Sequence, residues 1–174
     1  MYNTIADAVD KPIILYNVPS RTGVGIEPST YLALAEHPNI VGIKEANGNI
    51  SKIVETARLV GDKLAIYSGN DDQVIPILSM GGSGVISVLS NVMPAQTHEM
   101  CERFFKGDLA GAAKLQMDYL PLINALFSEV NPIPVKAAMA AMGWCENYLR
   151  MPLTRMEPEH GGQLKTIMRA HKLI

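Results

Sequence analysis

Four short apolar segments recur in the first half of the chain, with amphipathic segments between them. The apolar segments are rich in β-branched residues, are short enough for buried strands, and lie at residues 12–16, 40–44, 64–68 and 84–88. The segments between them have the pattern of helices and lie at residues 27–36, 49–61 and 71–81. A strand, a helix and a strand at this spacing predict βαβ units and a parallel sheet, hence an α/β fold.

The pattern changes after the fourth apolar segment. Four further segments have helical periodicity, at residues 93–106, 109–127, 134–143 and 158–171, and no strand pattern follows. The sequence therefore predicts two domains, with residues 1–92 forming four βα units and residues 93–174 forming a helical part.

Composition narrows the class of protein. Hydrophobic residues make up 48% of the 174 positions and charged residues 18%, which is typical of a globular chain. The net charge is -2 and no basic run occurs, so nothing indicates nucleic-acid binding. No apolar stretch reaches the roughly 18 residues of a membrane span, and residues 1–10 lack the order of a signal peptide. Cys101 and Cys145 are expected to be buried free thiols in a cytoplasmic protein.

Two strand ends carry side chains that could take part in chemistry. Lys44 ends an apolar strand, and burial would favour the neutral amine that forms imines with ketones. Tyr16 ends the preceding strand at the same edge, where a phenol can relay protons. The alternatives are a strand-end lysine that reaches solvent and a buried tyrosine with a satisfied hydroxyl group.

The loops after the strands offer weaker signals. Arg21 is the cation of the loop at residues 17–25, and its planar fork of donors suits a carboxylate, although an exposed loop arginine would look the same. Glycine-rich turns at residues 68–71 and 81–86 could bring backbone groups near a ligand or could be simple tight connections. The histidines have no ligand spacing among themselves or with the cysteines, so no metal site is predicted.

Taken in order, these segments resemble one family. The similarity rests on YNVPSRTG at 16–23, GIKEA at 42–46, SGND at 68–71, GGSGVISV at 81–88 and NPIPVKAA at 131–138. Together they resemble the dihydrodipicolinate synthase family, which folds as a TIM (β/α)₈ barrel followed by a helical C-terminal segment. The resemblance implies that the four strands are strands five to eight of the barrel. Residues 1–92 would then be the C-terminal half of the barrel, and residues 93–174 the last barrel helix and the helical extension.

The resemblance also implies a chemistry. Lys44 would form a Schiff base with pyruvate, and the resulting enamine would add to L-aspartate semialdehyde in lysine and diaminopimelate biosynthesis. Tyr16 would shuttle protons at the imine, and Arg21 would receive the carboxylate of the semialdehyde. Gly69 and Ile86 would line the pyruvate pocket. No metal or organic cofactor is implied.

Other functions stay open at this point. Within the same class, N-acetylneuraminate lyase and the sugar-acid pyruvate aldolases share the lysine and the tyrosine. A shortened chain could instead be a non-catalytic, oligomerising scaffold, or a module that binds a small molecule without turnover. Half a barrel would leave open sheet edges and apolar residues facing a gap, namely Ile14, Ile40, Ile66 and Ile86, so we expect a homo-oligomer.

Overall fold

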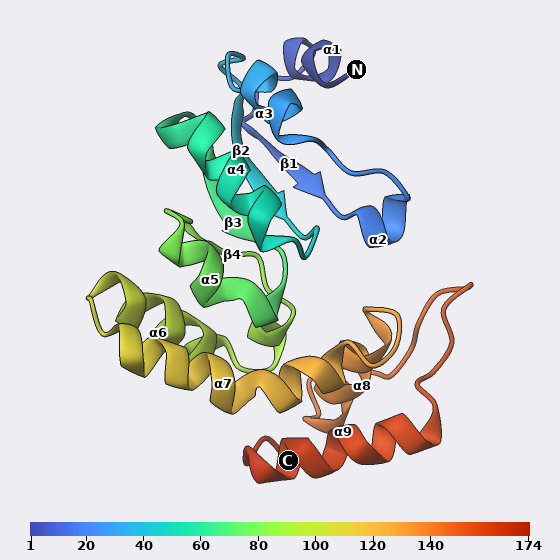
Figure 1. Cartoon of the computed structure of the whole chain (residues 1–174). Coiled ribbons are helices and arrows are strands. Elements are labelled where there is room, and N and C mark those ends of the chain that lie inside the picture. Colours follow the sequence, from blue (N-terminus) through green and yellow to red (C-terminus); the bar gives the residue numbers. More distant parts are fainter. The chain divides into compact units, whose positions relative to one another are not determined.

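A four-stranded parallel sheet organises the first part of the chain in the computed structural model, which describes all residues, 1–174 (Figure 1). Its strands are neighbours in sequence order: β1 (Ile13–Asn17), β2 (Ile40–Glu45), β3 (Ala65–Ser68) and β4 (Gly84–Val85). The predicted parallel sheet is thus confirmed. β4 is shorter than the apolar segment that predicted it, because the backbone enters a 3-10 turn, η3 (Leu89–Asn91), soon afterwards.

Helices follow the strands as predicted. Three of them connect successive strands: α3 (Pro28–Leu34), α4 (Ile50–Val60) and α5 (Val74–Ser79). α4 begins where the Asn49 side chain accepts a hydrogen bond from the Lys52 N–H at 3.1 Å. The pattern missed some short elements: α1 (Tyr2–Asp7), α2 (Pro19–Thr22) and the 3-10 turn η1 (Gly61–Lys63). The segment predicted as a helix at 71–81 begins with a 3-10 turn, η2 (Asp71–Gln73).

The expectation of a barrel represented by strands five to eight is wrong for this chain. The sheet is open, with β1 at one edge and β4 at the other. A (β/α)₈ barrel closes only when eight tilted strands pair in a ring, and four strands leave both edges unpaired. The observed fold class is therefore an open α/β sheet with four parallel strands, together with a helical unit.

The helices cover one face of the sheet. Leu15, Ile43 and Ile66 share a core with Tyr31 of α3 and Ile77 of α5. Side chains alternate along a strand, so the neighbouring positions point to the other face. That second face is called here the open face.

The residues of the open face differ in part from those expected. Ile14 and Ile86 are 44% and 39% exposed, as expected for these two side chains. Ile40 and Ile66 are only 3% and 4% exposed, because they point toward the helices. The pairing of β1 with β2 shifts between Ile13 and Ile14, and this irregularity moves Ile40 to the helix side.

The second part of the chain is helical, as predicted. Its helices are α6 (Pro94–Phe105), α7 (Leu109–Leu126), α8 (Ile133–Ala141) and α9 (Pro158–Ala170). Their core includes Leu122, Leu164 and Met168. Both cysteines are free thiols, although they are half-buried rather than buried. None of the helices has the length and the apolar character needed to cross a membrane.

Two compact units result, Met1–Ile86 and Ser87–Ile174. The division falls at Ile86, whereas the sequence pattern placed it after residue 92. The division of the chain into domains at residues 1–92 and 93–174 stays a prediction.

Candidate functional site

Lys44 and Tyr16 lie side by side on the open face. The two residues are register partners on β2 and β1, and the Lys44 Nζ lies 4.2 Å from the centroid of the Tyr16 ring. This is the geometry of a cation–π contact. Tyr16 is half-exposed and Lys44 is partly buried. The deep burial expected for Lys44 from its apolar strand is therefore not observed.

The row of residues through Lys44 continues to a second tyrosine. Tyr67 of β3 is the register partner of Lys44 on the side opposite Tyr16, and Gly84 of β4 is the partner of Tyr67. The phenol of Tyr67 therefore belongs to the same row as the amine. Tyr67 was not predicted as a site residue, because Ile66 was expected to point to the open face. The alternation of side chains in β3 places Tyr67 there instead, but this alternation can be used only once the register of the strand is known.

Gly69 leaves room for the stem of Lys44. A Cβ atom placed on Gly69 would lie 3.2 Å from the Lys44 Cγ, 2.8 Å from the Ala46 Cβ and 3.1 Å from the Glu45 carbonyl oxygen. The Gly69 N–H donates to that same carbonyl at 2.7 Å, so the close approach is fixed by the backbone. A side chain at position 69 would thus collide with the stem of the lysine, and the role of Gly69 in the site stays a prediction.

Ile86 follows β4, and Arg21 lies in the loop after β1. The Ile86 N–H donates to the Ser68 carbonyl at 2.9 Å, which extends the pairing of β3 and β4 by one residue. Arg21 lies in the last turn of α2, just beyond β1, with an exposed side chain. α2 ends at Gly23, whose φ of 72° belongs to the left-handed region that favours glycine.

A buried polar cluster lies behind Lys44, on the helix side of the sheet. Glu45 is 1% exposed, and its carboxylate accepts hydrogen bonds from the Asn17 Nδ2 at 3.0 and 3.2 Å, from the Tyr31 hydroxyl at 3.0 Å and from the Asn47 N–H at 2.9 Å. Burial raises the pKa of the Glu45 carboxyl, against the opposing effect of these donors. Burial and the nearby Glu45 carboxylate raise the pKa of the Tyr31 hydroxyl. In the sequence, Glu45 stands out only as part of the GIKEA motif at 42–46.

The polar residues do not form a metal centre. No group of three or more histidine, cysteine, aspartate or glutamate residues lies close enough together to hold a metal ion. The reactive groups along the row through Lys44 are an amine and two phenols. An amine beside a phenol is the arrangement used in imine chemistry, where the amine attacks a carbonyl and the phenol moves protons.

Comparison with known proteins decides the family. The model of the Dihydrodipicolinate synthetase family matches residues 1–171. The chain belongs to this family. A relative named 4-hydroxy-tetrahydrodipicolinate synthase, from Clostridium perfringens, is 50% identical over 173 residues, which cover 99% of this chain and 60% of the relative.

Solved structures of the same family agree with the fold. A dihydrodipicolinate synthase from Thermotoga maritima matches with a TM-score of 0.97 at 42% identity, over 99% of this chain and 60% of that protein. A chloride-inhibited dihydrodipicolinate synthase from Acinetobacter baumannii, solved in complex with pyruvate, matches with a TM-score of 0.96 at 39% identity, over 99% of this chain and 60% of that protein. The chain thus spans about three fifths of the length of the relatives that it matches.

Proposed function

We propose that this chain carries the Schiff-base lysine of a class I aldolase, and that Lys44 is that lysine. The observation that supports this role most strongly is the position of the Lys44 Nζ, 4.2 Å from the centroid of the Tyr16 ring on the open face of the sheet. Membership in the Dihydrodipicolinate synthetase family supports the reaction class.

The proposed first half of the reaction uses the pair of residues directly. The Lys44 amine attacks the ketone carbon of pyruvate, and loss of water gives a protonated imine. This imine withdraws electrons, so a proton leaves the methyl group and an enamine forms. Tyr16 donates a proton to the departing hydroxyl group and accepts protons at the imine, because its ring lies against the amine. The steps need no metal or organic cofactor.

The proposed second half joins the enamine to an aldehyde. The nucleophilic carbon of the enamine attacks the aldehyde of L-aspartate semialdehyde and forms a carbon–carbon bond. Arg21 receives the carboxylate of this substrate through its fork of N–H donors. Gly69 and Ile86 line the pyruvate pocket with backbone groups. The proposed pathway is lysine and diaminopimelate biosynthesis.

Reductive trapping tests the proposal. Incubation with pyruvate and borohydride should add one reduced pyruvate unit to the wild-type chain, and Lys44→Ala should abolish the adduct. Lys63→Ala is the matched control, since Lys63 is an exposed lysine of the same unit that pairs with Glu36. If Lys44→Ala were labelled as well as the wild-type chain, the assigned role of Lys44 would be refuted.

A coupled assay with L-aspartate semialdehyde then separates the remaining functions. Turnover supports the synthase reaction. Turnover with a sugar acid instead would favour an aldolase of the N-acetylneuraminate lyase type. An adduct without turnover would fit a binding module, and no adduct would fit a non-catalytic scaffold.

We also propose that the chain forms a homo-oligomer in the cytoplasm. β1 and β4 are unpaired edges, and the open face exposes Ile14, Tyr16 and Ile86. Unpaired edges and exposed apolar side chains favour self-association. Light scattering should give a mass of at least twice 18.9 kDa, and a stable monomer with a cooperative unfolding transition would refute this part.

A further inference from the structure

The loop that carries Arg21 is attached to the interior of the sheet. It leaves β1 at Asn17 and reaches α3 at Pro28. Its middle is exposed at Arg21 and Val24, and local hydrogen bonds such as that from the Thr22 hydroxyl to the Val24 carbonyl at 2.8 Å shape it. The two ends of the loop attach it to the sheet.

Asn17 holds both ends at once. Its backbone carbonyl accepts from the Ala46 N–H at 2.9 Å, which continues the pairing of β1 with β2. Its side-chain Oδ1 accepts from the Ile26 N–H at 3.0 Å, across the mouth of the loop. Its Nδ2 donates to the Glu45 carboxylate at 3.0 and 3.2 Å. The amide of Asn17 therefore bridges the far end of the loop and the residue that follows Lys44.

Glu45 fixes the orientation of that amide. A carboxylate only accepts hydrogen bonds, so it requires the Nδ2 of Asn17 to face it and turns the Oδ1 toward Ile26. The carboxylate itself is held from the opposite side by the Tyr31 hydroxyl of α3 at 3.0 Å. Burial raises the pKa of Glu45, and a buried polar group of this kind is costly unless its hydrogen bonds are made.

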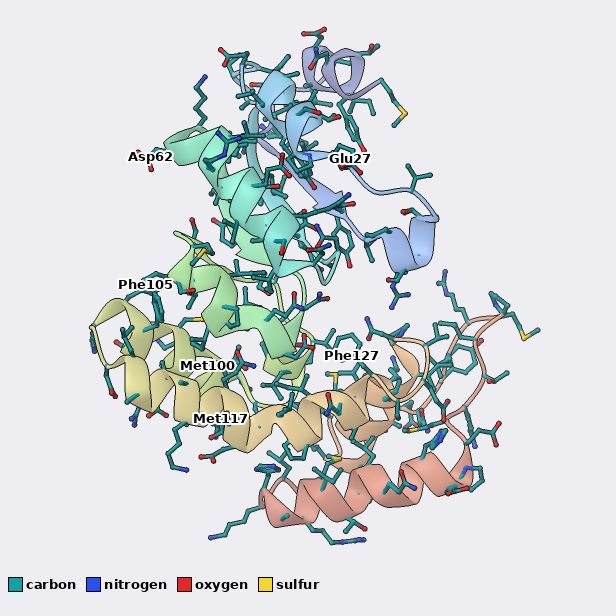
Figure 2. All side chains as sticks on the ribbon, in the orientation of Figure 1. Glu27, Asp62, Met100, Phe105, Met117 and Phe127 are labelled. Carbon is teal, nitrogen blue, oxygen red and sulfur yellow. The ribbon has the colours of Figure 1, made fainter.

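The end of the loop has a second attachment. Glu27, which Figure 2 labels, follows Ile26 and accepts from the Lys52 Nζ of α4 at 2.8 and 3.0 Å. Both partners are substantially exposed, and such a surface pair contributes little. The buried contacts of Asn17 therefore carry most of the restraint.

We propose that Glu45, Asn17 and Tyr31 are positioning residues that hold the Arg21 loop against the end of β2, one residue beyond Lys44. This inference rests on the proposed function, because it assigns the three residues to the capture of the substrate carboxylate by Arg21. None of them touches the reacting atoms. Lys44 points to the open face, whereas Glu45 points to the helix side and acts through the loop.

Hydrogen exchange of the loop tests the inference without any substrate. Asn17→Leu and Glu45→Leu remove the buried contacts, and exchange of the segment 18–27 should rise by about tenfold or more, since a hydrogen bond to a charged group contributes about 1.5–3 kcal/mol. Glu45→Gln keeps one of the two acceptor oxygens and replaces the other by a donor, so its exchange should lie between the wild-type rate and that of Glu45→Leu. Ile77→Val is the matched control, because it weakens the same core from α5 without altering the cluster.

Two further measurements separate positioning from a general loss of stability. In the coupled assay, Asn17→Leu should raise the KM for the semialdehyde by about tenfold, while the rate of pyruvate trapping at Lys44 stays within about threefold. Unchanged loop exchange in Asn17→Leu, or an equal rise in Ile77→Val, would overturn the inference. If the wild-type chain forms no adduct but the loop opens as described, the positioning of the loop stands and the proposed function fails.

Discussion

The contact between Gly69 and the stem of Lys44 gives the sharpest prediction. Gly69→Ala would add a methyl carbon 2.8 Å from the Ala46 Cβ, 3.1 Å from the Glu45 carbonyl oxygen and 3.2 Å from the Lys44 Cγ. Carbon atoms in contact normally lie about 3.5–4.0 Å apart. Two of the three neighbours belong to the backbone or sit directly on it, so they have little freedom to move. The flexible stem of Lys44 is the group that can give way.

The expected magnitude follows from two opposing effects. Overpacking of a tight site costs about 1–3 kcal/mol. Replacing glycine lowers the entropy of the unfolded chain and returns about 0.4–1 kcal/mol where the backbone conformation suits alanine. We therefore expect a net loss of about 1–2 kcal/mol of stability. Displacement of the Lys44 stem should also slow imine formation by about tenfold or more, because small misplacements of a nucleophile have large effects on rate.

Urea unfolding and reductive trapping measure the two effects. Gly162→Ala is the matched control, since a Cβ atom on Gly162 of α9 meets no atom within 4 Å. The free energy of unfolding of this control should rise by about 0.5–1 kcal/mol, and the control should trap pyruvate at the wild-type rate. If Gly69→Ala trapped pyruvate as fast as Gly162→Ala, the close approach of Gly69 to the lysine would have no functional role.

Three other predictions concern single residues. Burial raises the pKa of Glu45, so the contribution of this carboxyl to stability is present below its unfolded pKa and is lost as the pH rises through its folded pKa. The stability of Glu45→Gln should therefore rise relative to that of the wild-type chain from about pH 4.5 upward. Parallel curves of stability against pH for the two proteins would contradict this. The Thr56 hydroxyl is buried in α4 without a hydrogen-bond partner, so Thr56→Val should raise the free energy of unfolding by about 1 kcal/mol, as measured by urea titration. Arg21→Ala should raise the KM for L-aspartate semialdehyde by about tenfold or more and leave pyruvate trapping unchanged; unaltered semialdehyde kinetics would remove Arg21 from the site.

The strands and most helices could be predicted from sequence because each depends on a local pattern. Runs of β-branched residues at 40–44 and 64–68 predict strands, and the cap at Asn49 and the glycine at 61 mark the ends of α4. Short helices such as α1 and α2 carry too few turns for a periodic signal. The assignment of these strands to positions five to eight of a barrel came from the resemblance and not from a local pattern, and it was wrong: the four strands form an open sheet.

The candidate site was predicted in part. Lys44 and Tyr16 were placed together because both end parallel strands, and strand ends meet at one edge of the sheet. Tyr67 was missed because its face depends on register, which a shift of one residue reverses. The cluster around Glu45 was missed because its members lie 28 and 14 residues away along the chain, and only the fold brings them together.

Peptide mapping after borohydride reduction with pyruvate tests the central claim most directly. Trypsin cleaves after lysine and arginine, and a reduced adduct on Lys44 would block cleavage there, giving a modified peptide of residues 22–52. We predict that this peptide appears and carries the added mass, and that the unmodified peptide 22–44 decreases in proportion. Recovery of unmodified 22–44 in full, with the adduct absent or on another lysine, would contradict the assignment of Lys44 as the Schiff-base residue.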